Sequence, residues 1–178
     1  MLRVGAVFEE DWVWLLILII ALGSYWYFRH LDYTKNREIV SSERDEFLHS
    51  PIPTYIEKSM QAFNDGKFEG EDQSPLAYVG YKAGKTAGMN EKERRERLTV
   101  CFRLDVPANL PSKYRNWGKP ATALRFYKMH THLNMLAQQR RGRRGYETAV
   151  HHWSTDRMWF INKLSETAKR FGRYGFRR

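Results

Sequence analysis

Residues 12–28 read WVWLLILIIALGSYWYF, a stretch of seventeen residues in which no side chain carries a charge. As a helix rising 1.5 Å per residue, it would cover about 26 Å, close to the ~30 Å hydrocarbon thickness of a bilayer. Aromatic side chains typical of membrane interfaces stand at both of its ends: Trp12, Trp14, Tyr25, Trp26 and Tyr27. The stretch therefore predicts one transmembrane helix over residues 12–28, preceded by a short tail, residues 1–11.

Two other interpretations of this stretch remain open, a cleaved signal peptide and a buried core helix. A signal peptide begins with a basic region, whereas Glu9, Glu10 and Asp11 precede the apolar run here. The aromatic residues that follow Gly23 also suit an interfacial belt better than a cleavage site. We therefore favour a retained anchor.

Basic residues on either side of the stretch predict its orientation. Only Arg3 precedes the stretch, whereas four basic residues follow it closely: Arg29, Lys35, Arg37 and Arg44. Because basic flanks stay on the cytoplasmic side, we expect the N-terminus outside and the rest of the chain in the cytoplasm, at the inner or plasma membrane. A reducing compartment agrees with Cys101 as the single cysteine, which also excludes an intrachain disulfide framework.

The charge of the chain is concentrated in its C-terminal part. The 178 residues include 30 Lys and Arg against 20 Asp and Glu, a net charge of +10. Residues 1–28 carry a net charge of −2 and residues 29–72 one of −4, whereas residues 73–178 hold 23 basic and seven acidic residues, a net charge of +16. Such an asymmetry points to separate tasks for separate segments, and the basic segment is the one suited to a polyanion.

Residues 29–72 read as a juxtamembrane stalk that ends in an acidic linker. A charged helix is expected over residues 33–48, and Pro51 and Pro53 break it. Thr54, with Glu57 three residues later, predicts the N-cap of a second helix that continues to Phe63. Turns are expected at residues 65–66 and 70–72.

Residues 73–171 predict a basic domain of about four helices, so that the chain is expected to be all-α. Ser74 and Pro75 begin the first helix, which carries Leu76, Val79 and Ala83, and Asn90 with Glu93 begins the second. The second helix is expected to expose its early Glu and Arg residues and to bury Leu98, Cys101 and Phe102. Pro120 stands at the entry of the third helix, and the fourth runs from Tyr146 to about Phe171. No segment alternates at period two, so no strands are expected.

Several residues in this domain are expected to have structural roles. Trp117, Gly118 and Pro120 belong to a predicted turn, and Trp153 and Asp156 lie in the last predicted helix. A buried tryptophan needs a partner for its indole N–H. Asp156 is expected to pair with a nearby arginine such as Arg125, since buried charges persist only when paired.

Short motifs occur in a fixed order through this part of the chain. They are GYKAG at residues 80–84, ERR at 93–95 with Leu98, WGKP at 117–120 with Arg125, and WSTD at 153–156 with Trp159. In this order they resemble a small helical domain that recurs in bacterial proteins, fused or alone, over residues 74–164. Some of those proteins are associated with nuclease or mobile-element functions. The resemblance implies a helical fold, assigns no activity, and leaves the apolar stretch outside it.

Two basic clusters are candidate polyanion sites. The first is the RRGRRG sequence of residues 140–145, with Arg140, Arg141, Arg143 and Arg144 between two predicted helices. The second extends from the end of the last helix into the tail at residues 172–178 and contains Lys169, Arg170, Arg173, Arg177 and Arg178. Either cluster suits the phosphates of nucleic acid, an anionic lipid surface or an acidic protein, and a solvated loop without a partner also stays open.

The sequence holds no pattern that points to catalysis. His130 and His132 are two residues apart and His151 and His152 are adjacent, spacings at which helical side chains do not chelate a metal together. No P-loop and no nucleophile beside a base is present. We expect no metal, no cofactor and no enzymatic activity.

Three functions fit these observations. The first is a single-pass membrane protein whose cytoplasmic basic domain binds nucleic acid or another polyanion. The second is an accessory subunit of a larger membrane complex, in which the basic face meets protein partners. The third is an effector that acts on a lipid surface.

Overall fold

The computed structural model describes residues 8–67, 73–86 and 89–175, with side chains from residue 12 to residue 172. Within these ranges the regular elements are all helices, as expected from the sequence, and no strand occurs: α1 (Phe8–His49), α2 (Thr54–Asn64), α3 (Pro75–Tyr78), α4 (Glu91–Arg103), α5 (Ser112–Arg115), α6 (Ala123–Arg140) and α7 (Glu147–Gly175). The chain divides into two compact units, Met1–Val40 and Ser41–Arg178. The all-α prediction is thus confirmed for the described residues.

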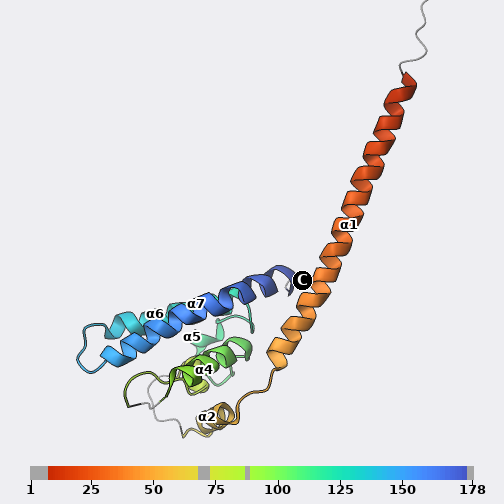
Figure 1. Ribbon diagram of the computed structural model, residues 1–178. Helices are drawn as coiled ribbons and strands as arrows, with labels where there is room; N and C mark the ends of the chain where they lie inside the picture. The colour runs from red at the N-terminus through yellow and green to blue at the C-terminus, as the bar shows by residue number, and fades with distance from the viewer. Residues whose placement is uncertain (1–7, 68–72, 87–88, 176–178) are drawn as a thin grey trace, which may run out of the picture. The chain divides into compact units, whose positions relative to one another are not determined.

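The first unit contains most of α1, the long red-to-orange helix of Figure 1. By length and composition this helix is apolar enough to cross a membrane, and the residues of its apolar part are exposed, for example Ile20 at 63% and Trp26 at 69%. The sequence predicted a separate charged helix over residues 33–48, but α1 continues without interruption to His49. It ends before Pro51 and Pro53, as expected.

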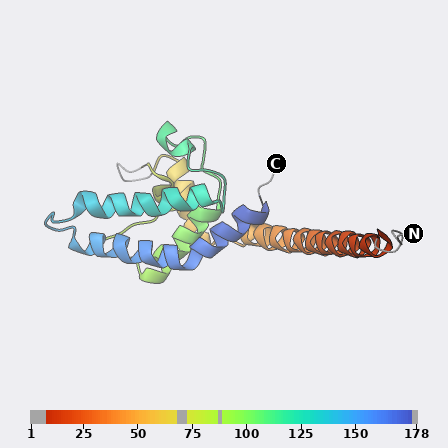
Figure 2. The ribbon, with the colours of Figure 1, turned by 90° about the horizontal axis from the view of Figure 1, so that it is seen from above.

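The second unit is built around the antiparallel pair α6 and α7, which lie side by side in both views, with α4 packed against them (Figures 1 and 2). Its core contains Leu98 and Phe102 of α4, Met129 and Leu133 of α6, and Phe160 of α7, all without solvent exposure. These residues recur at helical spacing on each element, which is why the three helices bury one face each.

A series of phenylalanine rings connects the helices of the second unit. Phe126 of α6 stacks on Phe160 of α7 at 5.2 Å between ring centroids, and Phe160 meets Phe102 of α4 edge to face at 5.8 Å. Phe102 in turn contacts Phe47, near the end of α1, at 6.1 Å. Edge-to-face and offset-stacked pairs are the preferred aromatic geometries, so this series orients four elements at once.

Part of the predicted stalk contributes to this core. Ile56 of α2 has no solvent exposure, and Phe63 of α2 packs edge to face on Tyr78 of α3 at 5.5 Å. Residues 41–67 therefore pack as part of the second unit. The predicted turn at residues 70–72 lies outside the described residues.

The caps of the helices follow the sequence in two places and depart from it in others. Ser74 and Asn90 cap α3 and α4 as predicted, and Asn90 forms the full capping box with Glu93. The prediction of a Thr54 cap is wrong, because Pro53 occupies the N-cap of α2 and its carbonyl accepts from Ile56 and Glu57. The prediction of Pro120 at the entry of the third helix is also wrong.

The side chain of Thr122 caps α6 by accepting from the N–H of Arg125 at 3.2 Å, and Pro120 lies in the preceding turn. Ala83 lies beyond α3, which ends at Tyr78, so its placement in the first helix is wrong as well. The short helix α5 was not expected from the sequence.

Candidate polyanion interface

The loop between α6 and α7 presents three exposed arginines, Arg141, Arg143 and Arg144. Gly142 and Gly145 adopt positive φ angles of 75° and 86°, which let the chain make two consecutive turns. The backbone N–H of Arg143 donates to the carbonyl of Arg140 at 3.1 Å, which closes the first turn. The guanidinium groups thus project from a short, hydrogen-bonded connection between two helices.

These arginines are free of carboxylate partners within the described part of the chain. Arg140 lies over the ring of Tyr146, with its guanidinium carbon 4.9 Å from the ring centroid. The nearby Glu147 bonds to the backbone instead: its carboxyl accepts hydrogen bonds from its own N–H and from that of Gly145. These bonds lower the pKa of the carboxyl. The loop therefore keeps its positive charge available to a ligand.

The second predicted cluster lies at the other end of α7. Lys169 and Arg170 are more than twenty residues from Glu147, about 35 Å along the helix. Lys169 pairs with Glu166 at 2.7 Å, and Arg170 pairs with Glu43 at 2.9 Å. The fold therefore does not bring these two residues to the arginine loop. The side chains of Arg173, Arg177 and Arg178 lie outside the described residues.

Four other arginines lie inside the protein: Arg94, Arg97, Arg103 and Arg125. The burial of Arg94 and Arg97 contradicts the expectation that α4 exposes its early arginines. Arg125 is 1% exposed, and its guanidinium donates to four carbonyls. Those of Cys101 and Leu104, at 3.0 and 2.7 Å, belong to the end of α4, and those of Trp117 and Gly118, at 3.3 and 2.6 Å, to the following turn. Arg125 thus satisfies carbonyls that a helix end leaves without partners.

Arg97 and Arg103 do the same for two further helix ends. Arg97 donates to the carbonyl of Val79, the C-cap of α3, and to the hydroxyl of Ser59 at 3.1 Å. Arg103 donates to the carbonyls of Ser50 and, at 2.8 Å, Pro51, just beyond α1. Burial lowers the pKa of both groups, and of Arg125, from the usual arginine value. A positive charge near helix C-termini is also favoured by the helix dipole.

Asp156 is fully buried in α7 and pairs with Arg94 of α4, not with Arg125, so the predicted partner is wrong. Nε of Arg94 lies 2.6 Å from Oδ2 of Asp156, and the hydroxyl of Tyr81 donates to the same oxygen at 2.8 Å. Burial, together with the charge of Asp156, raises the pKa of Tyr81 well above its ordinary value. Arg125 is unavailable because its donors are used by carbonyls.

The remaining residues of predicted structural role lie around this interior. Trp117 is buried, with its ring 5.6 Å from that of Tyr114 and 5.3 Å from that of His132. Gly118 has a φ of 83°, where a Cβ would lie 3.1 Å from Leu124. Trp153 is half-buried on α7. None of these side chains adjoins the arginine loop in sequence, and their contacts are those of packing.

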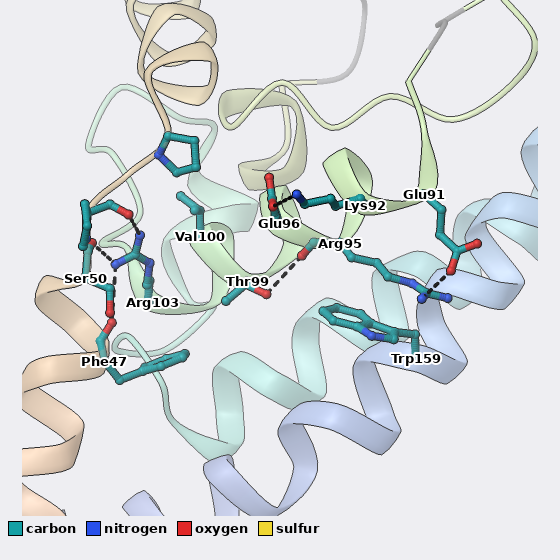
Figure 3. Close-up of a pocket in the computed structure, with 12 residues that line it drawn as sticks. Phe47, Ser50, Glu91, Lys92, Arg95, Glu96, Thr99, Val100, Arg103 and Trp159 are labelled. Atoms are coloured by element: carbon teal, nitrogen blue, oxygen red, sulfur yellow. Dashed lines mark hydrogen bonds and ion pairs between the residues drawn. The ribbon is translucent and has the colours of Figure 1, made fainter.

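Two hollows of about 640 and 590 Å³ adjoin each other; the first is lined mainly by α4 and by residues between Phe47 and Pro53, and the second mainly by α7. Both are lined by Arg95 of α4 and Trp159 of α7, and we call them together the α4/α7 groove; Figure 3 shows the residues that line the first hollow. The guanidinium carbon of Arg95 lies 5.3 Å from the centroid of the Trp159 ring, and Arg95 also pairs with Glu91. This groove was not predicted from the sequence.

A signal for the groove was present in the sequence. Between Glu147 and Glu166 the only acidic residue is Asp156, so a helical prediction for this segment leaves its solvent face without negative charge once Asp156 is placed inside. The sequence could not predict that this face pairs with Arg95, because Arg95 belongs to a helix more than fifty residues earlier.

The histidines lie among aromatic rings. His130 packs 5.3 Å from Phe126, and His132 packs edge to face on Tyr114 at 6.0 Å. Within the described residues, no three His, Cys, Asp or Glu side chains gather in a way that could hold a metal ion. No family model, curated protein or solved structure matches the chain, and its function is therefore inferred from the residues described above.

Proposed function

We propose that the chain is a single-pass membrane protein whose basic helical unit binds nucleic acid and catalyses no reaction. The observation that carries this proposal is the loop between α6 and α7, where Arg141, Arg143 and Arg144 are exposed and have no carboxylate partners among the described residues. Guanidinium groups bind phosphate oxygens through two parallel hydrogen bonds, so three of them on one short loop suit a phosphate backbone.

An aromatic ring beside the arginines favours nucleic acid over other polyanions. Tyr146 is 38% exposed at the base of the loop, where Arg140 lies over its ring. Bases stack on exposed aromatic rings and on guanidinium planes, so Tyr146 and Arg140 offer a nucleic acid a contact in addition to charge. Binding would be largely independent of base sequence, because the contacts go to phosphates.

The apolar part of α1 supports the membrane anchor in this proposal. Its length and composition suit a bilayer, and the basic residues that follow it favour a cytoplasmic position for the second unit, at the inner or plasma membrane. The anchor would then hold the arginine loop close to the membrane, so that the protein tethers nucleic acid there.

A salt titration of binding tests the role of the loop. The full chain in neutral detergent is titrated against a labelled single-stranded oligonucleotide at several salt concentrations, and compared with the variant R141Q/R143Q/R144Q. Each phosphate contact contributes about 0.7 to the slope of log K against log salt for single strands, so the triple variant should lower that slope by about 2.

The matched control removes three exposed charges from another surface. The variant K113Q/R115Q/K119Q lowers the net charge by the same amount at and just after α5. It should leave the slope almost unchanged. A slope near zero for the unaltered chain, or equal slopes for the two triple variants, would contradict the proposal.

A second function, an accessory subunit of a membrane complex, is favoured by one specific observation. The side chains of Leu124, Tyr127 and Met135 on α6 are 50%, 56% and 40% exposed, and they form an apolar stripe on a helix that otherwise packs on α7. Such a stripe suits a protein partner. Purification in mild detergent distinguishes the functions: a stoichiometric partner that survives nuclease and high salt, and is lost in L124S/Y127S, would favour the subunit.

A further inference from the structure

The indole of Trp159 lines both hollows of the α4/α7 groove, whereas the ring of Phe47 lines only the larger one. The side chain of Trp159 is half-buried, and the guanidinium of Arg95 stacks against it from α4 (Figure 3). Both hollows that border the pair fall within the range of volumes at which proteins bind small planar groups. A nucleobase is such a group, and stacking on tryptophan is largely independent of which base it is.

The α7 side of the groove carries positive charge without a competing carboxylate. Lys163 lines the groove, is exposed, and forms no ion pair within the described residues. Asp156, the only acidic residue between Glu147 and Glu166, is buried and paired with Arg94. A phosphate backbone can therefore follow α7 from the loop as far as Lys163 without meeting a surface carboxylate; the next one, Glu166, is exposed one turn later and pairs with Lys169.

The α4 side of the groove has a different character. Glu91 pairs with Arg95, and Glu96 pairs with Lys92 at 3.9 Å, so the wall is close to neutral. Its carboxylate oxygens disfavour phosphate and can accept hydrogen bonds from the N–H groups of a base, such as N3–H of thymine. The two walls thus fit a nucleotide in one orientation, with the base toward α4 and the phosphate toward Lys163.

The arginine loop and the groove lie within reach of one strand, because α7 joins them. Trp159 follows Glu147 by twelve residues, about 18 Å along the helix. A stacked strand advances about 3.4 Å per nucleotide, so about five nucleotides cover this length.

From these observations we infer that the α4/α7 groove binds an unpaired base of single-stranded nucleic acid, with Trp159 as the stacking surface and Lys163 as a phosphate contact. This inference rests on the proposed function and adds a selectivity to it. The bases of a duplex are stacked and paired inside the helix, so they cannot present a face to Trp159. Single strands should therefore bind through the loop and the groove, and duplexes through the loop alone.

The test compares a twelve-nucleotide oligothymidylate with a duplex of the same length, by fluorescence polarisation on the full chain in neutral detergent. Trp159→Leu should weaken single-strand binding about tenfold and change duplex binding less than about twofold, because only the strand loses a stacking contact. Tyr127→Leu removes an exposed aromatic ring from α6, away from the groove, and should leave both affinities unchanged.

A milder variant keeps the test valid if Trp159→Leu loses helix content by circular dichroism. Trp159→Phe retains a ring, so this variant should bind the oligothymidylate nearly as well as the unaltered chain. Oligothymidylate should quench the emission of Trp159 in the unaltered chain, and most of this quenching should be lost in the variant. Full quenching in W159F would overturn the inference, as would equal losses of single-strand and duplex affinity in W159L. If the unaltered chain binds neither probe, the proposed function fails; if it binds both and the Trp159 variants behave like it, only the groove assignment fails.

Discussion

Nε of Arg94 on α4 lies 2.6 Å from Oδ2 of Asp156 on α7, and the two side chains are only 5% and 0% exposed. A second bond joins Nη2 of Arg94 to Oδ1 at 3.3 Å, and the hydroxyl of Tyr81 completes the coordination of the carboxylate. Two opposite charges have thus been taken out of water together, with their hydrogen bonds largely satisfied. Such pairs tolerate joint replacement far better than the loss of one member.

The first prediction concerns this pair. Asp156→Leu or Arg94→Met alone should lower the free energy of unfolding by about 3–5 kcal/mol, because each leaves an uncompensated buried charge. The double variant R94M/D156L should cost clearly less than the sum of the two. Urea titrations of the four proteins, followed by circular dichroism, measure the coupling, and additive losses would contradict it.

Two glycines of similar backbone conformation provide the second prediction. Gly80 and Gly142 have φ angles of 71° and 75°, but a Cβ at Gly80 would lie 2.7 Å from Nη1 of Arg97 and from Ser59, whereas none would be near at Gly142. Gly142→Ala should cost about 1 kcal/mol from the left-handed conformation alone. Gly80→Ala should cost about 2 kcal/mol more, from crowding against α2 and α4. Equal losses in urea titrations would mean that the space around Gly80 adapts.

The third prediction uses Cys101 as a reporter of unfolding. The thiol is 2% exposed, and burial raises its pKa to about 12. At pH 8 only about one thiol in ten thousand would be thiolate, the reactive form. Ellman's reagent should therefore leave the folded chain unmodified and label one thiol per chain in urea. Rapid labelling without denaturant would show that α4 opens locally.

Acidification provides the fourth prediction. The backbone N–H of Gly84 donates to Nδ1 of His152 at 3.2 Å, so the imidazole is neutral there, and burial and the charge of Arg94 lower its pKa. The unfolded chain therefore binds this proton more tightly than the folded chain. Stability should be fullest above about pH 6.5, the ordinary histidine value, and should fall as the pH drops through it toward the lower folded value.

His130 adds to the same dependence, because burial and then the charge of Arg157 lower its pKa too. Urea midpoints measured from pH 7.5 to 5.5 should fall in the unaltered chain, less in His152→Gln, and least in H130Q/H152Q. A flat profile for the unaltered chain would contradict the assignment of both histidines.

The sequence predicted those features of the fold that depend on neighbouring residues. Ser74 and Asn90 cap helices because their side chains reach N–H groups three residues away, and Leu98, Cys101 and Phe102 are buried because helical periodicity places them on one face of α4. Thr54 failed as a cap for an equally local reason. Pro53, the residue before it, occupies the N-cap position, and its carbonyl accepts the first hydrogen bonds of α2.

The arginines could not be sorted in the same way. Arg97 and Arg103 look like surface residues of a charged helix, and they are inside because carbonyls of Val79, Ser50 and Pro51 reach them from elsewhere in the chain. Arg94 did carry a hint in its spacing, because it lies four residues before Leu98 and seven before Cys101, on the apolar face of α4. The loop arginines lie between two helices, as predicted. Gly142 and Gly145 adopt positive φ angles there, which separate the end of α6 from the start of α7.

The carbonyl contacts of Arg103 can form only after a long part of the chain has been synthesised. Ser50 precedes Arg103 by 53 residues, so its carbonyl leaves the ribosome about 3 to 10 seconds before the guanidinium that will hold it. During that interval water must satisfy the end of α1. The contacts that hold residues 50–51 are therefore completed late, only once α4 has been translated, although both partners belong to the same unit.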